Sequence, residues 1–333
     1  MSDHHRNAPV GVVVGYDGSG RAEVAVARAA EEAVRRRTRL AVALVAADPA
    51  AEPGEQQAAD DERALRELVA RTRRRRPGLT VTAHRATGDA AASLRDLSER
   101  AVLLVVGARG RGSESPPPVG LLGAPVQRTV TSLGSVSRTS LHLASCPVLV
   151  VPETVRAAAG DRQALVVAGV DNDGTGPAVL RAALEEALRR EGRVRLLHAY
   201  ADRPPGAGLQ RARAFSRELV RDVAPTGAAV TAVVTPEPPG VALSRHAADA
   251  DVLVVGARGS STLTGLLADS VSRAVIEALP CTVLVVTPRS ARRLAPAART
   301  PAPGIPRLPS ARVPSELAAR SRARQASPLR SRP

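Results

Sequence analysis

The chain has 333 residues, a formal net charge of +15, and 44% hydrophobic and 24% charged residues. This length favours two domains of ordinary size, each with its own core. Aromatic residues make up only 1%, which argues against proteins that read nucleic acid or sugar by aromatic stacking. The apolar runs are far shorter than the roughly 20 residues that span a bilayer, and the first nine residues resemble no secretory signal. We therefore expect a cytoplasmic protein with no membrane contact.

Within the first half, short Val-rich runs alternate with longer helical patterns, which predicts strand and crossover-helix units in a parallel sheet. The strands are expected near residues 10–15, 39–46, 79–85, 101–107 and 147–152.

The second half repeats the first. Val-Val-Gly-Ala-Arg-Gly occurs at 105–110 and 254–259, and Ser-Val-Ser-Arg occurs at 135–138 and 270–273. Because the order of the blocks is the same, the chain is a tandem duplication, with domains at residues 1–155 and 161–288. The second set of strands is expected near residues 164–170, 193–199, 227–234, 251–256 and 282–287.

The distance between the two blocks is 14 residues longer in the first copy, which locates an insertion at about 113–132. Three consecutive prolines, Pro116, Pro117 and Pro118, lie in it. Proline favours extended backbone, so we predict a surface loop there.

The positive charge is concentrated at the end of the chain. Residues 289–333 hold eleven Arg and one acidic residue, Glu316, which leaves +5 for the rest. Pro, Ser, Ala and Arg without periodicity predict a disordered tail, and one hypothesis is weak, nonspecific nucleic-acid association through it. Every basic residue is Arg and none is Lys, so a coding bias is the competing explanation.

Both copies resemble the universal stress protein family through their glycine blocks and the aspartates, Asp17 and Asp171, that follow the first strand of each copy. The resemblance covers about residues 8–287. It implies two tandem, open five-stranded parallel sheets with helices on both faces, a Rossmann-like fold of the adenine-nucleotide α-hydrolase-like type. It also implies ATP, with Mg²⁺, bound through a Gly-x2-Gly-x9-Gly-Ser/Thr motif and an aspartate that helps to hold the adenosine.

The first copy is the better candidate for the nucleotide site. It keeps Asp17, Gly107, Gly110, Gly134 and Ser135, provided that the insertion loops outward. Glycines let the backbone approach phosphate oxygens, and the following helix offers free N–H groups.

The second copy carries Gly256, Gly259 and Ser270, but Asp269 replaces the last glycine. An aspartate there would cap the helix and repel phosphate, which weakens the site. Asp171 and Asp173 are compatible with Mg²⁺ binding, although a polar turn is the favoured reading. His198 is expected to be a polar residue of the pocket.

No Ser-His-Asp arrangement, carboxylate pair or Lys-bearing phosphate loop appears, so we expect no enzyme. The hypotheses are a nucleotide-linked stress or signalling module, with an unknown protein partner, and a nucleotide-free adaptor. In the family the last strands of two domains pair antiparallel, so we predict an intramolecular pseudo-dimer; a further homodimer stays open. Cys146 and Cys281 precede these strands and are expected to pack as small hydrophobes at opposite ends of the junction, without a disulfide.

Overall fold

The computed structural model describes residues 11–44, 55–85, 89–110, 133–153, 162–200, 208–257 and 281–294. All of these residues belong to one compact unit, residues 1–295. Within them, no helix is long and apolar enough to cross a membrane.

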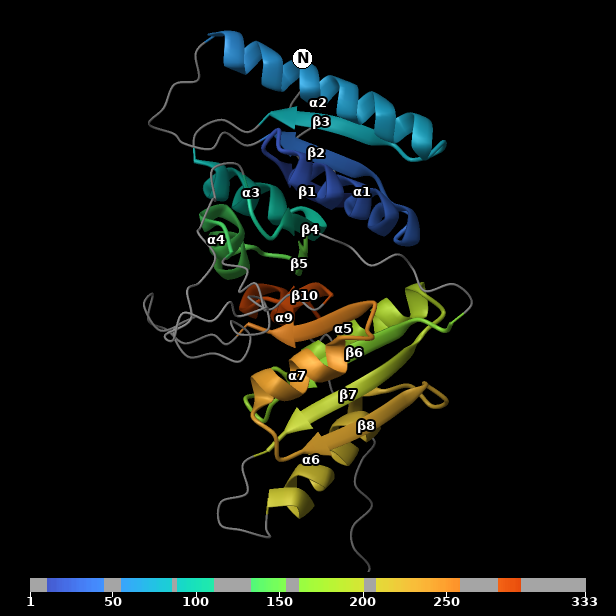
Figure 1. Cartoon of the computed structure of the whole chain (residues 1–333). Helices are drawn as coiled ribbons and strands as arrows, with labels where there is room; N and C mark the ends of the chain where they lie inside the picture. Colours follow the sequence, from blue (N-terminus) through green and yellow to red (C-terminus); the bar gives the residue numbers. More distant parts are fainter. Residues whose placement is uncertain are drawn as a thin grey trace, which may run out of the picture. The chain divides into compact units, whose positions relative to one another are not determined.

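The described residues of the first half form five strands and four helices in alternation (Figure 1). In chain order these are β1 (Gly11–Tyr16), α1 (Gly20–Arg35), β2 (Leu40–Leu44), α2 (Glu55–Arg75), β3 (Val81–Arg85), α3 (Ala90–Ser98), β4 (Ala101–Gly107), α4 (Ser135–Leu143) and β5 (Val148–Val151).

The second half repeats this order over its described residues. Its elements are β6 (Leu165–Val170), α5 (Gly176–Arg189), β7 (Arg193–Ala199), α6 (Gly208–Val223), β8 (Val230–Thr235), α7 (Pro239–Ala247), β9 (Val252–Gly256), β10 (Thr282–Val286) and α9 (Pro288–Leu294). Each predicted strand is therefore present. The strands at 101–107 and 193–199 match the prediction at both ends, and no end differs by more than three residues.

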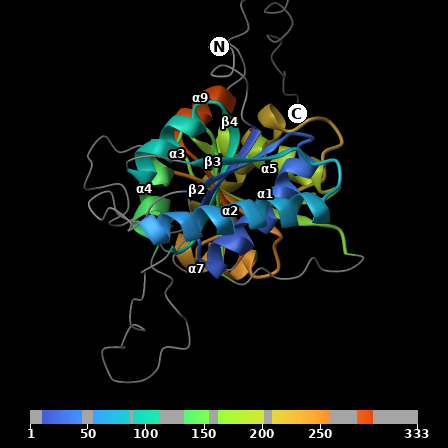
Figure 2. The same cartoon turned by 90° about the horizontal axis from the view of Figure 1, so that it is seen from above.

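The central strands are almost entirely apolar because helices cover both faces of the sheet. Every residue of β2 and of β10 is buried. One core cluster lies under α1, α2, α5 and α6, and the other lies under α3, α4 and α7. Viewed from above, α1 lies on one side of the strands and α3 and α4 lie on the other (Figure 2).

The ten strands form a single sheet in the order β3-β2-β1-β4-β5-β10-β9-β6-β7-β8. Neighbouring strands are parallel within each half, whereas β5 and β10 are antiparallel. In that pair Val150 lies opposite Val283 and Val148 lies opposite Val285. The tandem five-stranded fold and the pairing of the two halves are thus confirmed.

Both cysteines are free and buried, in agreement with a packing role. The antiparallel register puts them beyond opposite ends of the β5–β10 pair. Burial raises the pKa of the Cys146 thiol to about 12. Because the reactive form is the thiolate, this thiol is not poised for redox chemistry at neutral pH.

The predicted start of the disordered tail at Arg289 is wrong for the first residues, which form α9. Ser290 is buried and its Oγ donates to the Thr287 carbonyl at 3.0 Å. Arg289 donates to the Leu143 carbonyl at 3.2 Å, and Leu294 packs against the core. Periodicity was invisible in so short a segment, and its order comes from these tertiary contacts. The rest of the tail and the insertion at 113–132 lie outside the described residues.

Candidate functional site

The carboxyl ends of β1 and β4 meet at one edge of the first half, because these two strands are parallel neighbours. Asp17 follows β1, and the Gly107–Gly110 segment begins at the end of β4. A Cβ atom on Gly110 would lie only 2.7 Å from Asp17 Oδ2. Glycine therefore lets Asp17 approach the loop this closely, since any larger residue would displace the carboxylate, at the edge where ligands bind to parallel sheets.

The start of α4 is fixed against the same loop. The Gly134 N–H donates to the Ala108 carbonyl at 3.0 Å, and Ser137 Oγ donates to the Gly107 carbonyl at 2.7 Å. Gly134 is the N-cap and has no side chain to cap the helix, while Ser135, the first helical residue, is exposed. The N-terminal N–H groups of α4 thus keep the partial positive charge that suits an anion.

The turn after β1 orients Asp17. Its Oδ1 accepts from Ser19 N at 3.0 Å and from Ser19 Oγ at 2.6 Å. Ser19 in turn caps α1, since its Oγ accepts from Ala22 N at 3.2 Å. Oδ2 of Asp17 is the oxygen that faces Gly110. Ser19, the N-cap of α1, therefore fixes the Asp17 carboxylate with one oxygen directed toward the loop.

In this way the structure brings together all the residues predicted for the first copy: Asp17, Gly107, Gly110, Gly134 and Ser135. They come from the ends of β1 and β4 and the start of α4.

The corresponding edge of the second half holds a cavity of about 60 Å³. Asp171, Asp173, Thr175 and Gly256 are among its lining residues. Small-molecule sites measure roughly 300 Å³ or more, so the part of this cavity enclosed by described residues is small for a nucleotide. Within the described residues no group of three or more His, Cys, Asp or Glu could hold a metal ion.

Thr175 has a structural role that its sequence position did not predict. Asp173 Oδ1 accepts from Thr175 N at 2.9 Å and from Thr175 Oγ1 at 2.7 Å, which is the turn that Asp17 and Ser19 make in the first half. The signal was the tripeptide Asp-Gly-Ser or Asp-Gly-Thr, which occurs two residues later relative to the strand in the second copy. Asp171, the predicted counterpart of Asp17, accepts instead from the Asn172 N–H at 2.8 Å.

Gly256 lies against this turn, since a Cβ atom there would be 2.8 Å from Thr175 Oγ1. Gly259, Asp269 and Ser270, the remaining residues of the second motif, lie outside the described residues.

The expectation that His198 belongs to this pocket is wrong. Its neighbours Leu197 and Ala199 line the cavity, and side chains alternate along a strand. His198 therefore points to the opposite face, where its ring lies 4.9 Å from that of Phe215. Its Nδ1 is 3.1 Å from the Val170 carbonyl oxygen. His198 is therefore a buried core histidine with a backbone hydrogen-bond partner.

Comparisons with known proteins agree with this architecture. The sequence profile of the universal stress protein family matches residues 11–152 and 165–287. Universal stress protein Rv2623 of Mycobacterium tuberculosis is 28% identical over 84% of this chain and 97% of its own length. A universal stress protein of Mycolicibacterium smegmatis is 30% identical over 84% of this chain and 97% of its own length.

Among solved structures, that of a universal stress protein from Archaeoglobus fulgidus aligns with a TM-score of 0.63 and 18% identity. The alignment covers 83% of this chain and 98% of that one. This likeness supports the fold. The names of these relatives state no reaction.

Proposed function

The chain belongs to the universal stress protein family, and we propose that it is a nucleotide-binding signalling module whose principal ATP site lies in the first half. The observation that carries the proposal is the assembly of Asp17, Gly110 and Gly134 at one sheet edge. Glycines at 107, 110 and 134 leave room for phosphate oxygens to approach the backbone, and the N-terminus of α4 has no side-chain cap. Both features suit a phosphate chain.

Each residue has a separate task in this proposal. The N–H groups of the loop after β4 and of the start of α4 would hold phosphate oxygens, and the exposed Ser135 would add a hydroxyl donor. Asp17, held by the Ser19 turn, would accept from the adenosine. Mg²⁺ would arrive with ATP and offset the charge of the phosphates. In the second half Asp171, Gly256, Gly259 and Ser270 would form a weaker site, because Asp269 opposes phosphate.

Isothermal titration of the full chain with ATP and Mg²⁺ tests the proposal. Gly110→Ala should weaken binding at least about tenfold, which is about 1.4 kcal/mol, because the new methyl group would displace Asp17. Gly20→Ala is the matched control, since a Cβ atom there meets nothing within 4 Å. Equal affinity in the two variants would show that the loop is not the phosphate site.

A second pair of variants exchanges the residue at the last glycine position of the motif, which is Gly134 in the first copy and Asp269 in the second. Gly134→Asp should weaken the first site, and Asp269→Gly should strengthen the second. If the unmodified chain binds no adenine nucleotide at all, the nucleotide-free adaptor becomes the better hypothesis.

The composition of the tail favours a second, independent activity. Residues 295–333 hold eight Arg and one acidic residue, so nonspecific binding of nucleic acid by counterion release is expected. Because α9 is part of the fold, the test is a truncation after Ala295 and not at Pro288. Duplex DNA affinity should fall steeply with salt in the full chain and be lost on truncation; salt-resistant binding by the truncated chain would contradict this.

A further inference from the structure

A hexapeptide repeat lies outside the glycine blocks. Glu-Glu-Ala-Val-Arg-Arg at 31–36 recurs as Glu-Glu-Ala-Leu-Arg-Arg at 185–190. The two copies form the last turns of α1 and α5 and end just beyond them. The residue after each copy, Arg37 or Glu191, has the same positive φ of 50°. The two helices therefore end in the same way.

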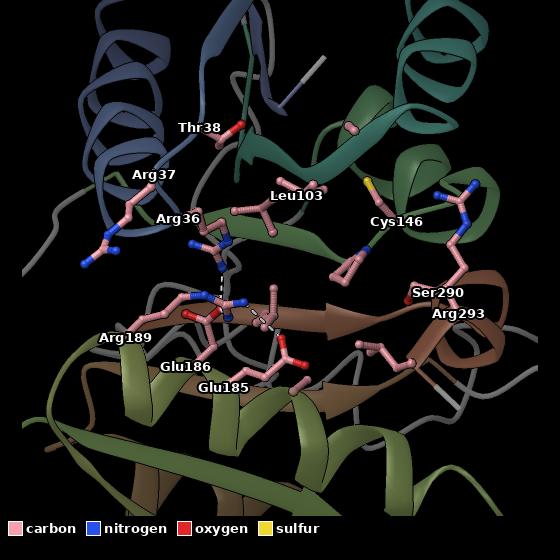
Figure 3. Close-up of a pocket in the computed structure, with 16 residues that line it drawn as sticks. Arg36, Arg37, Thr38, Leu103, Cys146, Glu185, Glu186, Arg189, Ser290 and Arg293 are labelled. Atoms are coloured by element: carbon pink, nitrogen blue, oxygen red, sulfur yellow. Dashed lines mark hydrogen bonds and ion pairs between the residues drawn. The ribbon is translucent and has the colours of Figure 1, made fainter. Parts of the chain in front are cut away.

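Four charged side chains of this repeat contact one another across the two halves, and we call them the pairing quartet: Glu32, Arg36, Glu186 and Arg190. Each glutamate accepts from the arginine four residues later in its own helix. Each glutamate also accepts from the arginine of the other half, Arg36 for Glu186 and Arg190 for Glu32. Figure 3 shows Arg36 and Glu186 meeting at the boundary, seen from the cavity that they line.

The quartet is buried. Side-chain exposure is 0% for Glu32, 2% for Glu186, 8% for Arg36 and 4% for Arg190. Within the quartet each carboxylate has one arginine partner from each half. Arg28 and Arg35 also pair with Glu32, and Arg189 pairs with Glu186. The carboxylates are the most deeply buried groups, so each depends on the guanidinium groups around it for its charge partners.

Buried ion pairs add little net stability compared with well-packed apolar residues, because desolvation of the charges offsets their attraction. Removing one partner, however, leaves a buried charge uncompensated and is strongly destabilising. Such a set therefore discriminates between partners more than it stabilises any one of them. The apolar β5–β10 pair offers no comparable selectivity, since its facing residues are all Val and Leu.

We propose that the pairing quartet selects the domain that docks on the β5 edge of the first half. The partner it fits is a universal stress domain whose first helix ends in the same Glu-x3-Arg arrangement, and in this chain that domain is its own second half. The arrangement is self-complementary: each half presents what the other requires, as in a twofold interface.

A charge-swap cycle in the full chain tests this proposal. The second-half swap, Glu186→Arg with Arg190→Glu, keeps an opposite pair within α5 but sets like charges against Glu32 and Arg36. The first-half swap, Glu32→Arg with Arg36→Glu, does the same from the other side. Combining the two swaps restores opposite charges across the junction. The new arginines at positions 32 and 186 would also be repelled by Arg28, Arg35 and Arg189, which pair with the native glutamates. This repulsion is the same in the single and the combined swaps, so it cancels in the coupling free energy of the cycle.

If the two swaps were independent, their effects on the free energy of unfolding would add. We expect the unfolding equilibrium constant of the combined swap to be at least about tenfold smaller than this additive value. Light scattering supplies a second readout. In the second-half swap, the charges of a first half still complement those of a first half from another chain, and the same holds for two second halves. Chains should therefore pair with one another, and the measured mass should rise about twofold. In the combined swap the mass should return to that of the unmodified chain.

The matched control is Glu62→Arg with Arg66→Glu, which swaps an exposed pair of the same spacing on α2; it should change neither readout. If a single swap does not fold, folding of the combined swap supports the proposal and its failure to fold overturns it. Strict additivity of the two swaps, or an unchanged mass in the second-half swap, also overturns it.

Discussion

The turn after the first strand differs between the two halves, whereas the end of the first helix is the same in both. In the first half Asp17 and Ser19 form a capping turn beside Gly110, while in the second half Asp173 and Thr175 form it two residues later. The hexapeptides at 31–36 and 185–190, by contrast, place their four quartet residues in equivalent contacts.

The difference follows from what each region contacts. The hydrogen bonds from Ser19 to Asp17 and from Thr175 to Asp173 stay within their own half, so losing one of these turns leaves the bonds of the other intact. A change in one quartet residue instead removes a partner from a buried charge of the other half. Coupled positions are constrained together, whereas uncoupled positions are free to diverge, as in the two nucleotide sites of unequal quality that we propose.

The largest expected effect is the loss of a quartet residue. Glu32→Ala leaves Arg36 and Arg190 with one carboxylate fewer in a buried site, so the free energy of unfolding should fall by about 3–5 kcal/mol. Glu62→Ala removes an exposed glutamate with a partner at the same spacing and should cost less than about 1 kcal/mol. Urea denaturation at neutral pH measures both. Similar losses in the two variants would mean that the quartet is not a buried, coupled set.

Acid should act on the same residues more gradually. Burial raises the pKa of Glu32, but the charges of Arg190, Arg36 and Arg28 outweigh it and lower that pKa to about 2, from the ordinary value of 4.5. A depressed carboxyl pKa stabilises the folded chain above the unfolded value, and this contribution is lost as pH falls from about 4.5 toward 2.

The urea midpoint should therefore decline across that range, and Glu32→Gln should remove part of the decline. Glu62→Gln is the control and should leave the pH dependence unchanged. A decline that is the same in Glu32→Gln as in the unmodified chain would assign the acid sensitivity to other carboxyl groups.

Strand positions and the tandem organisation were predictable, because buried parallel strands are continuous apolar runs and the repeated blocks fall at their ends. The antiparallel β5–β10 pair was expected from the family resemblance and from the similarity of the two last strands. Asp17, Gly110 and Gly134 could be assigned together because a strand end, a glycine turn and a helix start each leave a local sequence signal.

The contacts that escaped prediction are those between elements distant in sequence. The hexapeptides at 31–36 and 185–190 look like ordinary exposed helix faces, since Glu and Arg four residues apart also pair on surfaces. The packing of α1 near α5 buries the charged side chains of the pairing quartet, while Val34 and Leu188 of these segments stay exposed. His198 follows the same rule: the strand was predicted, but which of its faces meets the pocket depends on the sheet.

The smallest expected effect returns to the two turns. Ser19 Oγ accepts from the Ala22 N–H and so caps α1, whereas Thr175, the N-cap of α5, makes no side-chain capping hydrogen bond. Both hydroxyls donate to their aspartate, Asp17 or Asp173, so alanine removes that bond in either half. Ser19→Ala should consequently cost about 1 kcal/mol more than Thr175→Ala, the contribution of a helix N-cap. Thermal or urea unfolding of the two variants at pH 7 measures the difference; an equal cost would show that the first-half turn gains nothing from capping, and that the two turns differ in position alone.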